Sequence, residues 1–119
     1  MPRAAFRVAR PGLLAALCVT CSVGMALAAA AAPVVIEFKD GVITPQTVEI
    51  ATGEAAELLI RNSGTSACEF ESKVLKKEAV VGPGQEMTVK LPALPAGSYA
   101  FVDEFHEHED TAQGVVVVK

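Results

Sequence analysis

The segment FVDEFHEHED, residues 101–110, concentrates the side chains of this chain that are able to bind metal ions. It contains both histidines of the sequence, and five carboxylates lie within positions 103–110. Carboxylate and imidazole groups together make a site suited to Fe(II), Fe(III), Mn(II), Cu(II) or Zn(II). The alternative is a solvated acidic loop, because a histidine beside carboxylates often forms only a surface ion pair. The residues before the segment help to decide between these interpretations.

The strand expected before this segment directs one carboxylate toward the interior. In GSYAFVD, residues 97–103, side chains alternate between two faces, so Tyr99, Phe101 and Asp103 share one face. The two aromatic residues mark it as the core face, and Asp103 follows at its edge. An inward carboxylate is costly unless it is paired or bound to a metal. Since His106 can fold back across a turn, the sequence predicts a metal site centred on Asp103 and His106.

Three further side chains are expected to contribute to this site. Glu104 directly follows the inward carboxylate, and His108 offers a second imidazole that binds metal or relays protons. Glu69 lies at the start of the expected partner strand, where strand twist can bring it over the edge. Beside it, Cys68 shares the parity of Phe70 and is most simply a small buried residue. If Cys68 were instead a thiolate ligand, the site would prefer Cu(I) or Zn(II).

The first 32 residues predict a cleaved secretory signal peptide. Residues 1–10 carry three arginines and no acid, and an apolar run with repeated Ala-x-Ala steps follows. Cleavage is expected between Ala29 and Val34. The alternative is an uncleaved membrane anchor, since about 20 apolar residues can span a bilayer. With a cleaved signal, the protein is expected in the periplasm.

Residues 33–119 are expected to fold as a single domain with one modest core. They carry seven basic residues against 14 acidic ones, a net charge of −7. Such a domain repels nucleic acid and anionic lipid and attracts cations. We therefore expect no nucleic-acid partner, and contact with the membrane only through partner proteins. Cys68 is the one cysteine of this part, so no internal disulfide is expected, and no Ser–His–Asp arrangement is readable.

The pattern of residues 33–119 predicts an all-β fold. Short runs rich in valine and isoleucine alternate with turns that contain glycine or proline, and no helix-length pattern interrupts them. This spacing is typical of an antiparallel Greek-key β-sandwich or a small barrel of six to eight strands. Tyr99 is expected to form a tyrosine corner. The expected strands are 34–39, 47–50, 56–62, 68–74, 78–81, 85–91, 98–103 and 114–119.

Three pieces of the sequence together resemble the cupredoxin-like domains. The first, ITPQTVEIATGEAAELLIRNSG, is similar to the opening strand pair of that family and its next strand, which ends in asparagine. The second, EAVVGPGQEMTVKLPALPAGSYAF, is similar to the central segment that ends in Gly-x-Tyr-x-Phe. The third is the loop that follows, with GVVVV as the closing strand. The resemblance covers nearly all of residues 34–119 and implies a cupredoxin-like Greek-key sandwich.

The copper ligands are where the sequence departs from that family. A blue-copper centre uses a Cys thiolate, two imidazoles and a weak axial Met. By the resemblance, Asp103 stands in the place of the Cys ligand and His106 in the place of the loop histidine. The axial Met position falls near Thr111, and the upstream His position falls at or next to Cys68 and Glu69. One of four ligands is retained, so the sequence argues against a blue-copper electron carrier.

The segments EFES, EAVVGPGQ and DEFH resemble a subset of the family. They are similar to small periplasmic cupredoxin-like proteins of bacterial iron-permease systems, and to the cupredoxin-like domain of a larger periplasmic component of elemental-iron systems. This resemblance implies an iron or copper ion in a non-blue site and a role in ferrous iron uptake. It implies Fe(II) oxidation, as a ferroxidase component, or hand-over to an iron-permease complex, together with a periplasmic redox partner. The alternative is a passive metal-buffering, delivery or interaction module with an acidic docking loop.

Overall fold

The computed structural model describes residues 4, 12, 24 and 31–119, so the predicted signal peptide lies almost entirely outside the described residues. Within 31–119 the chain forms nine strands and two single-turn 3-10 helices. In the part of the chain that is described, no helix is long and apolar enough to cross a membrane. The elements are β1 (Val34–Lys39), β2 (Val42–Thr44), β3 (Thr47–Ile50), β4 (Ala56–Asn62), β5 (Cys68–Ser72), β6 (Lys77–Val81), β7 (Glu86–Leu91), β8 (Gly97–Asp103), η1 (Glu104–His106), η2 (Asp110–Ala112) and β9 (Gln113–Val118).

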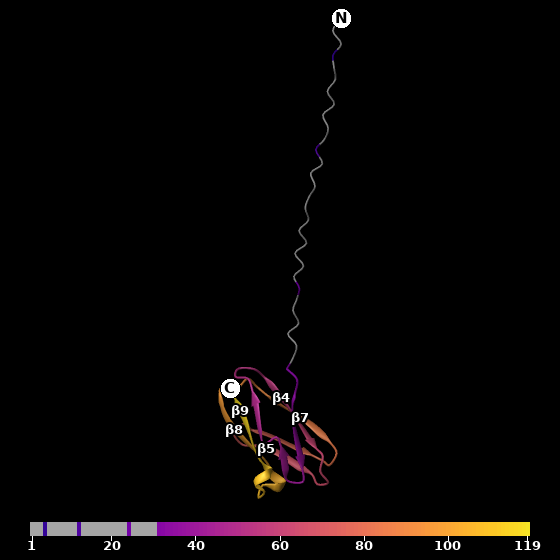
Figure 1. The fold of residues 1–119 in the computed structure, drawn as a ribbon, viewed down its shortest axis with the longest axis vertical. Helices are drawn as coiled ribbons and strands as arrows, with labels where there is room; N and C mark the ends of the chain where they lie inside the picture. Colours follow the sequence, from indigo (N-terminus) through magenta and orange to yellow (C-terminus); the bar gives the residue numbers. More distant parts are fainter. Residues whose placement is uncertain (1–3, 5–11, 13–23, 25–30) are drawn as a thin grey trace.

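The strands form two sheets that enclose the core. The four-stranded sheet has the order β2-β1-β4-β7, and the five-stranded sheet has the order β3-β9-β8-β5-β6. Figure 1 shows β4 and β7 on one side of the domain, and β8 and β9 on the other. The predicted all-β sandwich is confirmed. The predicted tyrosine corner is also present, since the Tyr99 hydroxyl donates to the carbonyl oxygen of Pro95 at 2.8 Å.

The structure differs from the predicted strand arrangement in two details. It contains one strand more than the pattern predicts, because β2 has only three residues, too few to show an alternation. The pattern also predicts antiparallel pairing, whereas β1 pairs with β4 and β3 with β9 in parallel. Pro45 follows β2 directly and has no N–H group for a ladder, which limits the length of this strand. After β2 ends at Thr44, the chain crosses to the other sheet and lies beside β9.

The core between the sheets has three phenylalanines at its centre. Phe70 and Phe101 stack with ring centroids 5.0 Å apart, and Phe38 meets each of them at 6.5 Å. Gly114 lies against the edge of Phe101, because a Cβ atom added there would be 2.2 Å from Cζ of that ring. The strand β9 therefore needs glycine opposite Phe101. The other apolar members of the core are Ile36, Ile43, Val48, Leu58, Ile60, Cys68, Ala79, Val81, Val89, Leu91, Val116 and Val118.

One end of the sandwich brings together three connecting segments. They are the turn at Asp40–Gly41, the loop 63–67 and the segment 103–112 with its two 3-10 helices. Figure 1 shows the last of these, in gold, at the end of the domain opposite to the C-terminus. We call these three segments the site rim.

Candidate metal centre

Asp103 ends β8 and points into the sandwich, as the alternation of the strand predicts. It is only 1% exposed. Both of its carboxylate oxygens have partners: Oδ1 accepts the backbone N–H of Glu69 at 3.0 Å, and Oδ2 lies 2.7 Å from Nδ1 of His106. These two contacts offset the cost of removing the carboxylate from water.

His106 folds back onto Asp103 from the single turn of η1. The side chain is 23% exposed, and Nε2, on the far side of the ring, lies 3.2 Å from Oγ of Ser66. When the Asp103 carboxylate is ionised, it only accepts hydrogen bonds, so Nδ1 carries the proton between them. The ring is then held by one nitrogen, and the other nitrogen faces Ser66.

Ser66 connects His106 to a second carboxylate, that of Asp40. The Ser66 hydroxyl donates to Oδ1 of Asp40 at 2.8 Å, and the same oxygen accepts the backbone N–H groups of Thr65 and Ser66, each at 2.9 Å. These donors, the Ser66 N–H foremost, hold the pKa of Asp40 below its usual value. Asp40 therefore keeps a negative charge beside the imidazole at neutral pH.

The loop that carries Ser66 is fixed by a buried amide at the end of β4. The Asn62 side chain donates to the carbonyl oxygens of Ser66 and Val81, each at 2.9 Å, and accepts the N–H of Gly64 at 2.9 Å. Gly64 allows the loop to close on Asp40, because a Cβ atom at this position would lie 2.6 Å from Oδ1 of that residue. The position of Ser66 is thus set by packing and hydrogen bonds on both sides.

The segment 103–112 is held by hydrogen bonds to neighbouring elements. Thr111 donates through its hydroxyl to the carbonyl oxygen of Gly41 at 2.7 Å. Gln46 donates to the carbonyl oxygens of Asp110 and Gln113 at 3.0 and 2.9 Å. These hydrogen bonds fix the backbone of the segment that carries His106.

The other three predicted ligands do not join the Asp103–His106 pair. Glu104, the first residue of η1, is exposed and turns toward Glu71 on the outer side of β5. Loss of hydration, followed by the hydrogen bond to Glu104 and its negative charge, raises the pKa of Glu71. Glu69 reaches Asp103 with its backbone N–H, and His108 is exposed. Whether any of the five binds a metal stays a prediction.

Cys68 lies in the core, as its parity with Phe70 predicts. The residue is 2% exposed and its thiol is free. Burial, followed by the nearby charge of Asp103, raises the pKa of the thiol from 9.0 to about 11. At neutral pH the sulfur is therefore protonated, and the structure favours the core interpretation over the thiolate ligand.

Comparison with known proteins assigns this sandwich to a family. A model of the cupredoxin-like domain matches residues 12–118. The chain belongs to the cupredoxin-like domain family. The resemblance read from the three sequence pieces is confirmed at this level.

Individual relatives of this cupredoxin-like protein are distant. The uncharacterised protein RP394 of Rickettsia prowazekii (strain Madrid E) is 35% identical over 83 residues, which are 70% of this chain and 65% of that protein. The match therefore spans just under two thirds of the length of this relative.

Two solved structures illustrate the likeness of fold. The metal-binding domain of the Cu(I)-exporting P-type ATPase CopA of Streptococcus pneumoniae D39, solved with Cu(I), has a TM-score of 0.63 at 17% identity, over 73% of this chain and 84% of that one. Reduced auracyanin from Roseiflexus castenholzii has a TM-score of 0.61 at 16% identity, over 76% and 99%.

The rim of this cupredoxin-like protein does not fit a blue-copper centre. Such a centre uses a thiolate, two imidazoles and a thioether, whereas the rim offers the Asp103 carboxylate and one imidazole. Near the expected axial position, the Thr111 hydroxyl is engaged with the backbone. Within residues 31–119, no three side chains of His, Cys, Asp or Glu are gathered as a metal-binding group. A metal at the rim would therefore bind through few protein ligands, with water completing its coordination.

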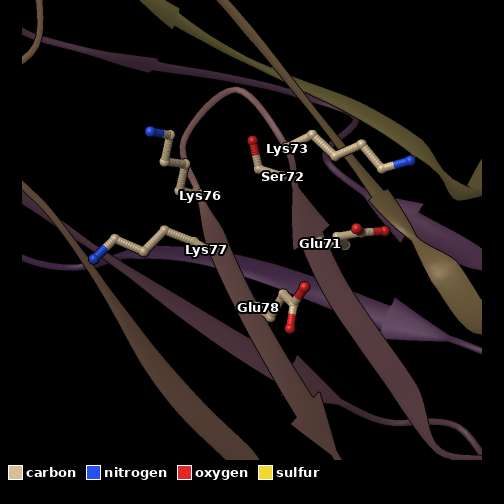
Figure 2. A pocket seen from close by; sticks show the side chains of 6 residues that line it. All are labelled: Glu71, Ser72, Lys73, Lys76, Lys77 and Glu78. Carbon is tan, nitrogen blue, oxygen red and sulfur yellow. The ribbon is translucent and has the colours of Figure 1, made fainter.

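A hollow of about 370 Å³ lies elsewhere, beside the turn between β5 and β6. Figure 2 shows that its lysine side chains point in different directions and do not converge. None of the predicted ligands lines this hollow, so it is separate from the candidate site. Its lining residues are Glu71, Ser72, Lys73, Lys76, Lys77 and Glu78.

Sequence reasoning missed two residues of the rim, Asp40 and Ser66. The Asp-Gly pair at 40–41 signals a hairpin turn, and both residues have positive φ angles, 45° and 86°. The signal does not show that this turn lies against His106. No Ser–His–Asp arrangement is readable in the sequence, whereas in the structure Oγ of Ser66 lies 3.2 Å from Nε2 of His106, and Nδ1 of that ring lies 2.7 Å from Asp103. Because the Ser66 hydroxyl donates its proton to Asp40, that proton is not directed at Nε2 of His106, and we do not interpret the arrangement as an activated nucleophile.

Proposed function

We propose that this protein is a periplasmic metal-binding protein of ferrous iron uptake, which binds an iron or copper ion at the site rim. The N-terminal segment, with its basic start and Ala-x-Ala steps, supports export. The family supports metal binding, since the structures of similar fold include a Cu(I)-bound domain. The resemblance of DEFH, residues 103–106, to proteins of iron-permease systems supports the iron context.

The observation that carries the proposal is the buried pairing of Asp103 with His106. The Asp103 carboxylate is 1% exposed, and it holds one imidazole in a fixed position at 2.7 Å at the edge of the core. Oxygen and nitrogen donors of this kind suit divalent iron and copper. The net charge of −7 over residues 33–119 raises the local concentration of cations around the rim.

The chemistry expected of the bound ion is limited by the donor set. Oxygen ligands favour Fe(III) over Fe(II), so a rim site makes oxidation of bound Fe(II) easier. That oxidation releases one electron, and the described residues 31–119 offer no soft copper site to accept it. The electron therefore has to pass to a periplasmic redox partner, and the ion has to pass to an iron permease. We place the protein as a component of this transfer and not as a self-sufficient ferroxidase.

Calorimetric titration of the purified protein tests metal binding. Fe(II), under anaerobic conditions, or Cu(II) is titrated into the wild type, His106→Ala and the control His108→Ala. The proposal predicts one ion per chain, near-complete loss of binding in His106→Ala and little change in His108→Ala, because only His106 is held by Asp103. Weak binding of several ions that neither substitution changes would refute a defined site.

A second function, docking on a basic partner, is favoured by one observation. Phe105 is 52% exposed and sits among the exposed carboxylates of Glu104, Glu107 and Glu109. An exposed apolar side chain with exposed acids before and after it in the sequence suits a basic surface of a membrane partner. Association with membranes that contain the iron permease should then weaken in Phe105→Ser and at high salt, while metal binding is unchanged. Association insensitive to both changes would argue against the acidic docking loop.

A further inference from the structure

We propose that His106 binds the metal ion through Nε2, that the Asp40 carboxylate is the second protein ligand, and that Asp103 orients the imidazole without binding the ion. This inference rests on the proposed metal-binding function and names the atoms of its site. The ion then lies on the side of the His106 ring that faces Ser66 and Asp40, and not on the buried side that faces Asp103.

Of the two ring nitrogens of His106, Nε2 is the one that is free to bind an ion. Nδ1 of His106 is engaged with Asp103 at 2.7 Å, and the other oxygen of that carboxylate accepts the N–H of Glu69 at 3.0 Å. A metal-binding histidine commonly donates its other ring N–H to a carboxylate, which fixes the ring and raises the basicity of the binding nitrogen. Asp103 has the position of such an orienting carboxylate, which leaves Nε2 as the nitrogen that faces a ligand.

Nε2 of His106 faces Ser66, and beyond it Asp40. It lies 3.2 Å from the Ser66 hydroxyl, which is 2.8 Å from Oδ1 of Asp40. One hydroxyl group therefore separates the imidazole from the carboxylate. Two ligand atoms on one ion lie roughly 3–4 Å apart, because each is about 2.0–2.2 Å from the metal. An ion that binds both Nε2 and the Asp40 carboxylate therefore takes the place of the Ser66 hydroxyl between them or binds that hydroxyl as well.

The two carboxylate oxygens of Asp40 differ in how strongly they are engaged. Its Oδ1 accepts the N–H groups of Thr65 and Ser66 at 2.9 Å, whereas its Oδ2 has a contact of 3.3 Å with the Thr65 hydroxyl. One oxygen thus anchors the side chain, and the other is available to a cation.

The segments that carry Asp40 and His106 are in direct contact. Gly41, which follows Asp40 in the turn, lies directly against the His106 ring: an added Cβ atom would be 3.3 Å from Cβ and 3.4 Å from Cδ2 of that residue. The Thr111 hydroxyl binds the carbonyl oxygen of the same glycine at 2.7 Å. The turn and the segment 103–112 are therefore packed against each other. The donor set, a carboxylate and an imidazole, selects Fe(II), Mn(II), Zn(II) or Cu(II) over the softer Cu(I).

The test uses Zn(II), a diamagnetic probe, and long-range 1H–15N NMR of the His106 ring in the full purified protein. We expect Zn(II) to shift the Nε2 signal and to leave the Nδ1 proton in its hydrogen bond with Asp103. Asp40→Asn keeps the acceptor oxygen for the loop N–H groups but removes the charge, so the protein should fold and bind Zn(II) at least about tenfold more weakly. The control is Asp110→Asn, a change at an exposed acid of the segment 103–112 that carries His106. It should change the Zn(II) affinity less than about twofold.

The possible results separate this inference from the proposed function. A Zn(II)-induced shift of Nδ1, with wild-type affinity in Asp40→Asn, would overturn the inference and place the ion between Asp103 and His106. Absence of any Zn(II) effect on either ring nitrogen would overturn both the inference and the metal-binding function. Because the NMR measurement on the wild type already names the binding nitrogen, the conclusion does not depend on the folding of a variant.

Discussion

At the scale of single residues, the buried thiol of Cys68 tests whether this residue belongs to the core. Because its pKa is raised to about 11, the native protein should react slowly with iodoacetamide at pH 7 and fully only after unfolding. The folded-state pKa lies above the unfolded value, so burial contributes stability below about pH 9 that is lost as the pH rises toward 11. Rapid alkylation of the native protein would show that the thiol is accessible.

Gly114 tests how tightly the aromatic core is packed. In Gly114→Ala the new Cβ would lie 2.2 Å from Cζ of Phe101, a ring that is fixed by stacking on Phe70. Overpacking of this kind costs about 1–3 kcal/mol, which denaturant unfolding can measure. Gly97→Ala is the control, because its Cβ would meet Tyr99 at an ordinary 3.7 Å. Equal stability of the two variants would contradict the packing of Phe101 on Gly114.

At the scale of elements, the loop 63–66 depends on the buried amide of Asn62. Asn62→Ala leaves the carbonyl oxygens of Ser66 and Val81 without their donor, which should cost about 1–3 kcal/mol of unfolding free energy. Ser63→Ala, at the exposed next position, should change stability by less than about 0.5 kcal/mol. Amide hydrogen exchange should also speed up across 63–66 in the first variant. Unchanged exchange there would mean that Asp40 alone holds the loop.

The same elements show how far sequence reasoning reaches. Eight of the strands follow from alternation and turn residues, because one buried face imposes a period of two on a strand. The sequence does not predict the three-residue β2 or the parallel pairings, since neither leaves a local pattern.

For the candidate site as well, some features could be predicted from the sequence and others could not. The inward direction of Asp103 and the fold-back of His106 follow from parity and short spacing. The roles of Asp40 and Ser66 do not, because they come from loops that are 40 or more positions away from His106 and meet it only in the folded chain.

At the scale of the whole molecule, the protein keeps the cupredoxin-like fold without the donors of a blue-copper centre. The purified protein with Cu(II) should therefore lack the intense blue absorption that a copper–thiolate bond produces. The reason is that Asp103 stands where the resemblance places the thiolate, while Cys68 is buried and protonated. An intense blue band would show that Cys68 binds copper and that the ligand assignment is wrong.

The central claim is that Asp103 and His106 work as one unit at the metal site. Its most direct test is a double-mutant cycle, in which Fe(II) or Cu(II) is titrated into the wild type, Asp103→Ala, His106→Ala and the double variant. Each single change disrupts the same hydrogen-bonded pair, so each should lose most of the affinity, and the two losses should not add. Additive losses, or near-wild-type binding by His106→Ala, would contradict the claim.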